Sequence, residues 1–211
     1  MAMWKISLLR ELEYSLLEKL TLHGKVLDLW WSRKSGYQEL IQGEHEFVVV
    51  NISEEHWYDM KFDIQEKFPL ADESFDAVIA INVLEHIYKF QNVVNESYRV
   101  LKKWGKLVFV TPFMFQVHWS PDDYFRYTKS ALQNIFEDAG FQNSHIKIEE
   151  MWTWIFHVFY QMVFWVVPTQ WLKYILKKIC VWIDYLFMKI SKKYKHSVKN
   201  YCLWYFIEVK K

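Results

Sequence analysis

The sequence predicts an α/β fold, built as a doubly wound, mostly parallel sheet. Short and nearly continuous apolar runs alternate with segments of helical period between residues 25 and 150. Such runs are typical of strands that are covered on both faces, and the alternation indicates parallel pairing. Polar residues follow several of the runs, as expected where ligands meet the carboxyl ends of parallel strands. We therefore expect one α/β core over residues 1–150.

The first 20 residues predict an amphipathic helix. Charged side chains interrupt the apolar pattern of MAMWKISLLRELEYSLLEKL. A secretory signal has an uninterrupted apolar stretch and a small-residue cleavage site, and this segment has neither. We expect a cytoplasmic location, with a peripheral position at the membrane as an alternative.

The strands and helices of the core follow in order. Parallel strands are predicted near residues 25–30, 46–51, 76–82 and 106–111, and an antiparallel strand near 201–209. A short helix is expected after the first strand, and another strand at 144–151. Further helices are predicted over residues 93–102 and 129–140, the second ending at Gly140 in the position after the helix.

Composition argues against several classes of partner. The formal net charge is +1, and no arginine-rich run or Cys/His finger spacing is present, so we expect no nucleic-acid partner. Cys180 and Cys202 are too few and too far apart to suggest a disulfide framework or a zinc site. We expect no metal.

Several segments carry a resemblance to a known family. The most specific is DESFDAVIAINVLEHI, followed by a helix that ends in RVLK and by a glycine before the next strand. From about residue 25 to residue 148 the chain resembles class I S-adenosylmethionine-dependent methyltransferases of type 11. The resemblance implies a seven-stranded Rossmann-like sheet whose final strand lies within 199–211. Residues 151–198 would then be a helical insertion.

The resemblance also implies a cofactor site for S-adenosylmethionine (SAM). After Asp28 the family has a glycine-rich turn, D-x-G-x-G-x-G, but Trp30, Ser32 and Lys34 stand at its glycine positions. Gly36 comes two residues late. A tryptophan at φ > 0 costs roughly 1–2 kcal/mol, and its indole would fill cofactor space, so we expect SAM binding to be weak or lost. Alternatively, the tryptophan packs in the core and plugs the site.

Other cofactor positions are implied by the same resemblance. Asn51 stands where the family has an acidic residue for the ribose, Asp63 matches the residue that binds the adenine amino group, and Ile64 would pack on the adenine ring. The carboxylate of Asp63 is equally compatible with a solvated loop. The methionine side would be lined by Asn82, Glu85 and His86.

The acceptor side is expected in residues 112–128. The segment DYFRYT is similar to a motif of methyltransferases found with cell-surface glycan genes, which suggests a small-molecule or glycan/lipid-linked acceptor. Alternatively, Asp122 or Asp123 caps the next helix and pairs with arginine. The candidate residues are His118, Asp123, Tyr124 and Arg126.

Residues 151–193 are rich in aromatic and lysine side chains. Pro168 closes a first apolar run, and an amphipathic run with lysines follows. Three interpretations are open: a peripheral membrane contact, a cap over the substrate cleft, and a homodimer surface. For the whole chain we expect SAM-dependent methyl transfer, and the alternative is an inactive pseudo-methyltransferase that serves as a membrane or partner scaffold.

Overall fold

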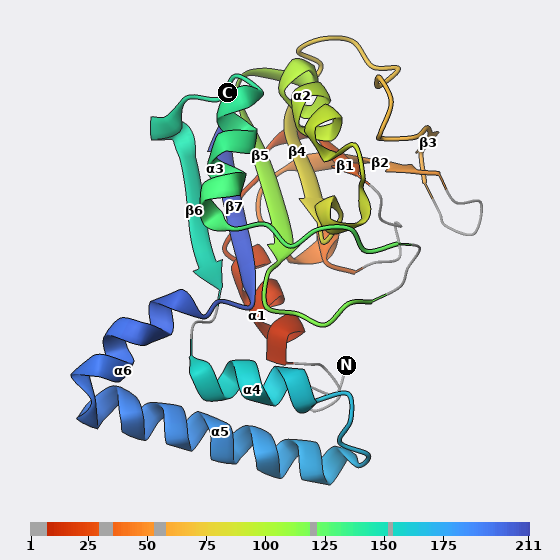
Figure 1. Cartoon of the computed structure of the whole chain (residues 1–211). Helices are drawn as coiled ribbons and strands as arrows, with labels where there is room; N and C mark the ends of the chain where they lie inside the picture. The colour runs from red at the N-terminus through yellow and green to blue at the C-terminus, as the bar shows by residue number, and fades with distance from the viewer. Residues whose placement is uncertain (1–7, 30–35, 53–57, 119–121, 152–153) are drawn as a thin grey trace.

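The computed structural model describes residues 8–29, 36–52, 58–118, 122–151 and 154–211. A seven-stranded sheet has the order β3-β2-β1-β4-β5-β7-β6 (Figure 1). Neighbouring strands from β3 to β5 are parallel, while β7 is antiparallel to β5 and to β6. The strands are β1 (Gly24–Leu29), β2 (His45–Asn51), β3 (Met60–Lys61), β4 (Phe75–Ile81), β5 (Leu101–Pro112), β6 (Ile146–Met151) and β7 (Trp204–Lys210). The predicted fold class is confirmed.

The central strands form because their side chains are buried on both faces of the sheet. In β4 every residue except Asp76 is buried, and the last four residues of β1 are buried as well. Burial on both faces explains why these strands appear in the sequence as continuous apolar runs. The outer strand β3 has only two residues, and no periodic pattern predicted it.

Helices cover both faces of the sheet. On one face lie α2 (Phe90–Val100) and α3 (Lys129–Asp138), which contribute Val93 and Phe136 to the core. On the other face, α1 (Leu8–Leu17) contributes Leu17. The predicted helix after β1 is only a 3-10 turn, η2 (Gln38–Leu40), within the described part of the connection.

A helical unit separates β6 from β7. It contains α4 (Ile155–Val163), α5 (Gln170–Ile190) and α6 (Lys192–Ser197). The chain leaves the sheet at Met151 and returns at Trp204, which pairs with Pro112 at the end of β5. The unit therefore lies at the carboxyl edge of the parallel strands, below the sheet in Figure 1. Among the described residues, no helix is both long and apolar enough to cross a membrane.

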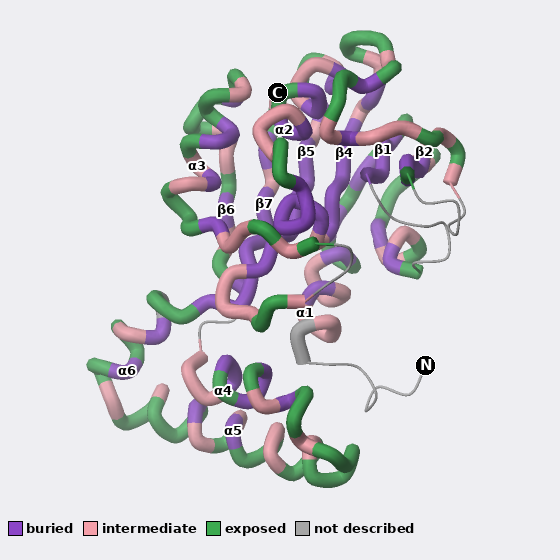
Figure 2. Tube along the Cα trace, turned by 45° about the vertical axis from the view of Figure 1, so that its right-hand side comes forward, coloured by how far each residue is buried: buried purple, intermediate pink, exposed green. Residues whose placement is uncertain are grey.

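A buried carboxylate holds the helical unit together. Asp184 of α5 is fully buried and accepts hydrogen bonds from the backbone N–H groups of Phe156 and His157 in α4. It also accepts from the His157 ring and from the Tyr194 hydroxyl of α6. In contrast, much of α5 remains exposed (Figure 2).

Candidate functional site

The candidate site lies at the carboxyl edge of β1, β2 and β4. Asp28, near the end of β1, is fully buried and accepts hydrogen bonds at 2.5 Å from the Tyr37 hydroxyl and the Gln38 amide. Burial raises the pKa of Asp28 to about 7, although these two bonds lower it. Oδ1 of Asp28 has no hydrogen-bond donor among the described residues. Tyr37 and Gln38 were not predicted as site residues.

The end of β2 lies beside the positions expected to bind adenosine. Asn51 is buried and pairs with Lys61 of β3, so that Asp63 follows two residues beyond the same edge. Oδ1 of Asp63 accepts the backbone N–H of Gln65 at 2.9 Å, which fixes the local turn. Ile64 is buried in the core. Asp63 and Ile64 thus follow closely on the short strand that pairs with the end of β2.

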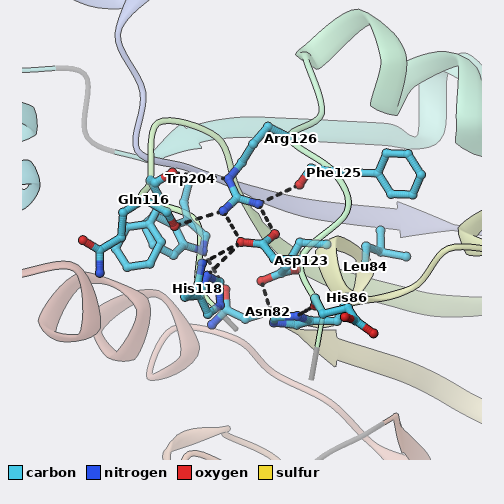
Figure 3. Close-up of polar contacts among 12 residues, drawn as sticks. Asn82, Leu84, His86, Gln116, His118, Asp123, Phe125, Arg126 and Trp204 are labelled. Carbon is cyan, nitrogen blue, oxygen red and sulfur yellow. Dashed lines mark hydrogen bonds and ion pairs between the residues drawn. The ribbon is translucent and has the colours of Figure 1, made fainter. Parts of the chain in front are cut away.

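The end of β4 is tied to two residues that sequence reasoning did not place at the site, Glu13 and Trp204. Asn82 has a φ of +55°, a left-handed conformation that asparagine tolerates. Its amide nitrogen donates to Glu13 of α1 at 2.8 Å, and its amide oxygen accepts from the Trp204 indole at 2.6 Å. Figure 3 shows Asn82 and Trp204 close together. Because both ends of its amide are engaged, the Asn82 side chain is fixed in place.

Glu85 and His86 follow in the 3-10 turn η3 (Leu84–His86). Glu85 is fully buried, and neither carboxylate oxygen has a hydrogen-bond partner among the described residues. Burial raises the pKa of Glu85 to about 8. Nδ1 of His86 is hydrogen-bonded to the backbone oxygen of Asp122.

The expected acceptor residues gather in the segment after β5. Arg126 binds Asp123 in a bidentate manner, with N–O distances of 2.5 and 2.6 Å. The His118 backbone N–H donates to Asp123 at 3.0 Å. Burial raises the pKa of Asp123, but the bonds from Arg126 and His118 outweigh it, so the pKa lies below its ordinary value. Tyr124 is 46% exposed and donates to the Asp122 carboxylate at 3.1 Å.

One expectation for this segment was wrong. Asp122 and Asp123 do not cap the next helix, because α3 begins only at Lys129 and Thr128 accepts the Ala131 N–H at 3.2 Å. The alternative that Arg126 pairs with a neighbouring aspartate is confirmed. Asp123 thus acts as an anchor for Arg126 and His118, while Tyr124 lies on the surface.

The turn after β1 lies mostly outside the described residues, including Trp30, Ser32 and Lys34. Gly36, at its end, has a φ of +76°, which favours glycine. Apart from its chain neighbours, no heavy atom of the described residues lies within 4 Å of the place a β-carbon would occupy there.

The charges at this edge fit the expected cofactor. SAM carries a sulfonium and an ammonium cation, and two buried carboxylates lie near the ends of β1 and β4, namely Asp28 and Glu85. Oδ1 of Asp28 and both carboxylate oxygens of Glu85 have no hydrogen-bond partner among the described residues, and buried charges are stabilised by opposite ones. Asn51 and Asp63 stand where the adenosine side is expected.

One family model matches part of the chain. Residues 33–109 match the family described as "Methyltransferase domain". No curated protein matches the chain.

Solved structures share the fold at low sequence identity. A SAM-dependent methyltransferase from Archaeoglobus fulgidus is 18% identical, with 96% of this chain and 94% of that chain covered and a TM-score of 0.59. Phosphoethanolamine N-methyltransferase 2 from Haemonchus contortus, in complex with SAM, is 14% identical, with coverage of 94% and 52% and a TM-score of 0.59. This chain thus spans about half of that enzyme. The [4+2]-cyclase SpnF is 15% identical, with coverage of 94% and 80% and a TM-score of 0.60.

Proposed function

We propose that this chain, which carries a methyltransferase domain on the class I methyltransferase fold, transfers a methyl group from SAM to a small-molecule or glycan/lipid-linked acceptor. The observation that carries the proposal is the meeting of Asp28, Asn51, Asp63 and Asn82 at one edge of the sheet. Residues 1–150 and 199–211 would form the core, and residues 151–198 a helical insertion. A shared fold alone does not fix the activity, so the site residues must support it.

Each of these residues would contact a different part of SAM. Asp63 would accept a hydrogen bond from the adenine amino group, Ile64 would pack on the ring, and Asn51 would hydrogen-bond the ribose. Asp28 would offset a cation of the methionine side, which Glu85 would line. SAM, when bound, supplies an electrophilic methyl group on sulfur. The protein would accelerate transfer mainly by placing the acceptor in line with that methyl group.

Cofactor affinity should be low for this fold. Asn51 offers a neutral hydrogen bond, and charge-assisted bonds are roughly twice as strong. Trp30 and Ser32 replace two glycines of the turn that otherwise lets backbone N–H groups approach the cofactor carboxylate. Both changes weaken SAM binding without removing the adenine contacts.

Calorimetric titration with SAM tests the assignment through Asp63. Replacement by alanine should lower the affinity at least about tenfold, because it removes the adenine contact. Asp72 is an exposed aspartate outside the strand edge, so Asp72→Ala is the matched control. Equal binding by both variants would contradict the assigned adenine site.

The acceptor should meet the segment after β5. His118 is partly exposed, and burial lowers its pKa below the ordinary value, which favours the neutral imidazole needed in a proton acceptor. Tyr124 is exposed on the same segment, and because its hydroxyl donates to Asp122, its oxygen can accept a hydrogen bond from a hydroxyl of the acceptor. Arg126 and Asp123 hold this segment in place. Arg126 and Asp123 are therefore residues that position the segment after β5.

The surface of α5 supports a second property, contact with an anionic membrane. Large apolar side chains on α5 are exposed, among them Trp171 at 64% and Trp182 at 63%. Lys173, Lys178 and Lys189 lie on the same helix, and each contacts an aromatic ring. Aromatic side chains beside lysines suit the interface of a membrane with anionic lipids.

The second candidate function is an inactive scaffold that uses this surface of α5. SAM binding distinguishes such a scaffold from an enzyme.

A further inference from the structure

We propose that Glu85, His86 and His118 form a binding site for one divalent transition-metal ion. One possible ligand atom from each residue lies within 4.8 Å of those from the other two. Two of the residues come from η3, and the third from the segment after β5. The sequence predicted no metal, because its two cysteines are too few and too far apart for a zinc site. Residues 85 and 118 lie far apart along the chain, so the cluster appears only in the fold.

The buried carboxylate of Glu85 lacks a partner that a metal ion could supply. Its side chain is fully buried, and neither carboxylate oxygen has a hydrogen-bond partner among the described residues. Nearly all buried polar groups in proteins have a partner, because a buried carboxylate without one is costly. Nε2 of His86 lies 3.9 Å from Oε1, beyond hydrogen-bond distance. A bound cation would supply the missing partner.

His86 is oriented with the lone pair of one ring nitrogen toward Glu85. Its Nδ1 is hydrogen-bonded to the backbone oxygen of Asp122, and a carbonyl oxygen can only accept. Nδ1 therefore carries the proton, and the lone pair of the neutral ring is on Nε2, which faces Glu85. Metal-binding histidines are commonly oriented in this way by a backbone carbonyl on the other ring nitrogen.

His118 lies beside His86 and contacts the Asp123–Arg126 pair. Its ring lies edge-on to the His86 ring, with 4.9 Å between centroids. Asp123 accepts the His118 backbone N–H and lies 3.2 Å from its Nδ1, while Arg126 holds Asp123 in turn. Figure 3 shows this chain of contacts from Arg126 to His118 beside His86. The His118 backbone is thus fixed by a carboxylate that also lies beside its ring.

The ligand types indicate the class of metal. Two imidazoles and one carboxylate suit Fe²⁺, Mn²⁺ or Zn²⁺, whereas Mg²⁺ prefers oxygen ligands. With bonds of about 2.0–2.2 Å, ligand atoms around one ion lie roughly 3–4 Å apart. The three side chains would therefore close by about an ångström on binding. Three protein ligands leave further coordination positions for water or for an oxygen of the acceptor, a role that rests on the proposed methyl transfer.

Metal binding can be measured without any methyl transfer. Full-length protein, stripped of metal by a chelator, is titrated with Mn²⁺ while the signal of the free ion is followed by electron paramagnetic resonance. We expect one bound Mn²⁺ per chain, displaced by Zn²⁺ and not by excess Mg²⁺. Glu85→Gln and His118→Ala should each weaken the binding at least tenfold. Glu85→Gln retains the shape of the side chain, and His118 is partly exposed, so both variants should fold.

The control is His23→Ala, which removes an exposed histidine outside the cluster and should leave Mn²⁺ binding unchanged. Stoichiometric binding that both site variants retain, or no stoichiometric binding by the wild-type protein, would overturn the proposal. SAM titration of the same chelator-treated samples keeps the two proposals apart. SAM binding without Mn²⁺ binding rejects only the metal site, and the reverse result rejects only the cofactor site.

Discussion

The indole nitrogen of Trp204 donates a 2.6 Å hydrogen bond to the side-chain oxygen of Asn82, across 122 positions of the sequence. The bond joins the start of β7 to the end of β4. Glu13 of α1 accepts from the other end of the same amide at 2.8 Å. Three segments that are far apart in the sequence thus meet at one polar side chain, which fixes the methionine side of the candidate cofactor site.

Removal of Glu13 should loosen this junction. In Glu13→Ala, the Asn82 amide and Arg10 lose a buried acceptor, and the free energy of unfolding should fall by about 1–3 kcal/mol. Urea denaturation measures this change. Glu18→Ala, at an exposed position after the same helix, should stay within about 0.5 kcal/mol of wild type. A similar loss in both variants would show that the junction is not what stabilises α1.

The buried carboxyl group of Asp28 should make stability depend on pH. Its pKa rises from 3.8 to about 7 in the folded state, so the folded protein holds this proton more tightly than the unfolded chain. The resulting stabilisation is complete below the lower value and is lost as the pH rises through the higher one. In Asp28→Asn this dependence should disappear.

Urea denaturation across this pH range measures the effect. The unfolding free energy of Asp28→Asn relative to wild type should increase with pH between the two values, by up to about 1.4 kcal/mol per unit. Outside that window the difference should be constant. Parallel curves for the two proteins would mean that Asp28 does not titrate in this range.

The Asp184 network should hold the helical unit together. Asp184→Ala leaves the ring of His157 and the hydroxyl of Tyr194 without their shared acceptor, at a cost of about 3 kcal/mol. Hydrogen exchange should accelerate in α4 and α6 while β4 and β5 remain protected. Asp138→Ala, at an exposed position in α3, is the control and should change neither region. Uniform acceleration in the sheet and the helices would contradict a local role.

The α5 surface should bind anionic vesicles in a flotation assay. Lysine attraction contributes on the order of 1 kcal/mol per residue near the lipid surface, so binding should weaken with salt. The double variant Trp171→Ala/Trp182→Ala should bind less. Trp104→Ala is the control, since Trp104 is 67% exposed but lies on β5. Failure of wild type to float, or self-association through this face in solution, would reject the membrane assignment.

The sequence predicted the central strands well because local burial determines their pattern. In β1 and β4, side chains are covered on both faces, so the apolar run itself identifies the strand. Gly140 marked the end of α3 because its φ of +104° favours glycine. These features depend on a few neighbouring residues and are therefore visible in the sequence.

Long-range contacts of the site could not be predicted in the same way. Glu13 and Trp204 reach Asn82 only after α1 and β7 have packed, and neither lies in a motif. Asp123 lies five residues before Thr128, which caps α3, and its role became clear only through the contacts of Arg126 and His118. The cluster of Glu85 and His118 likewise depends on the loop after β5 returning to η3.

The binding of SAM, measured by calorimetry, tests the central claim most directly. The wild-type chain should bind one SAM weakly, and the triple variant Trp30→Gly/Ser32→Gly/Asn51→Asp should bind at least about tenfold more tightly, because it restores the glycine turn and the ribose carboxylate. If the triple variant binds no better than wild type, the weakened-site account is wrong. If neither protein binds SAM, the strand-edge site is not a cofactor site.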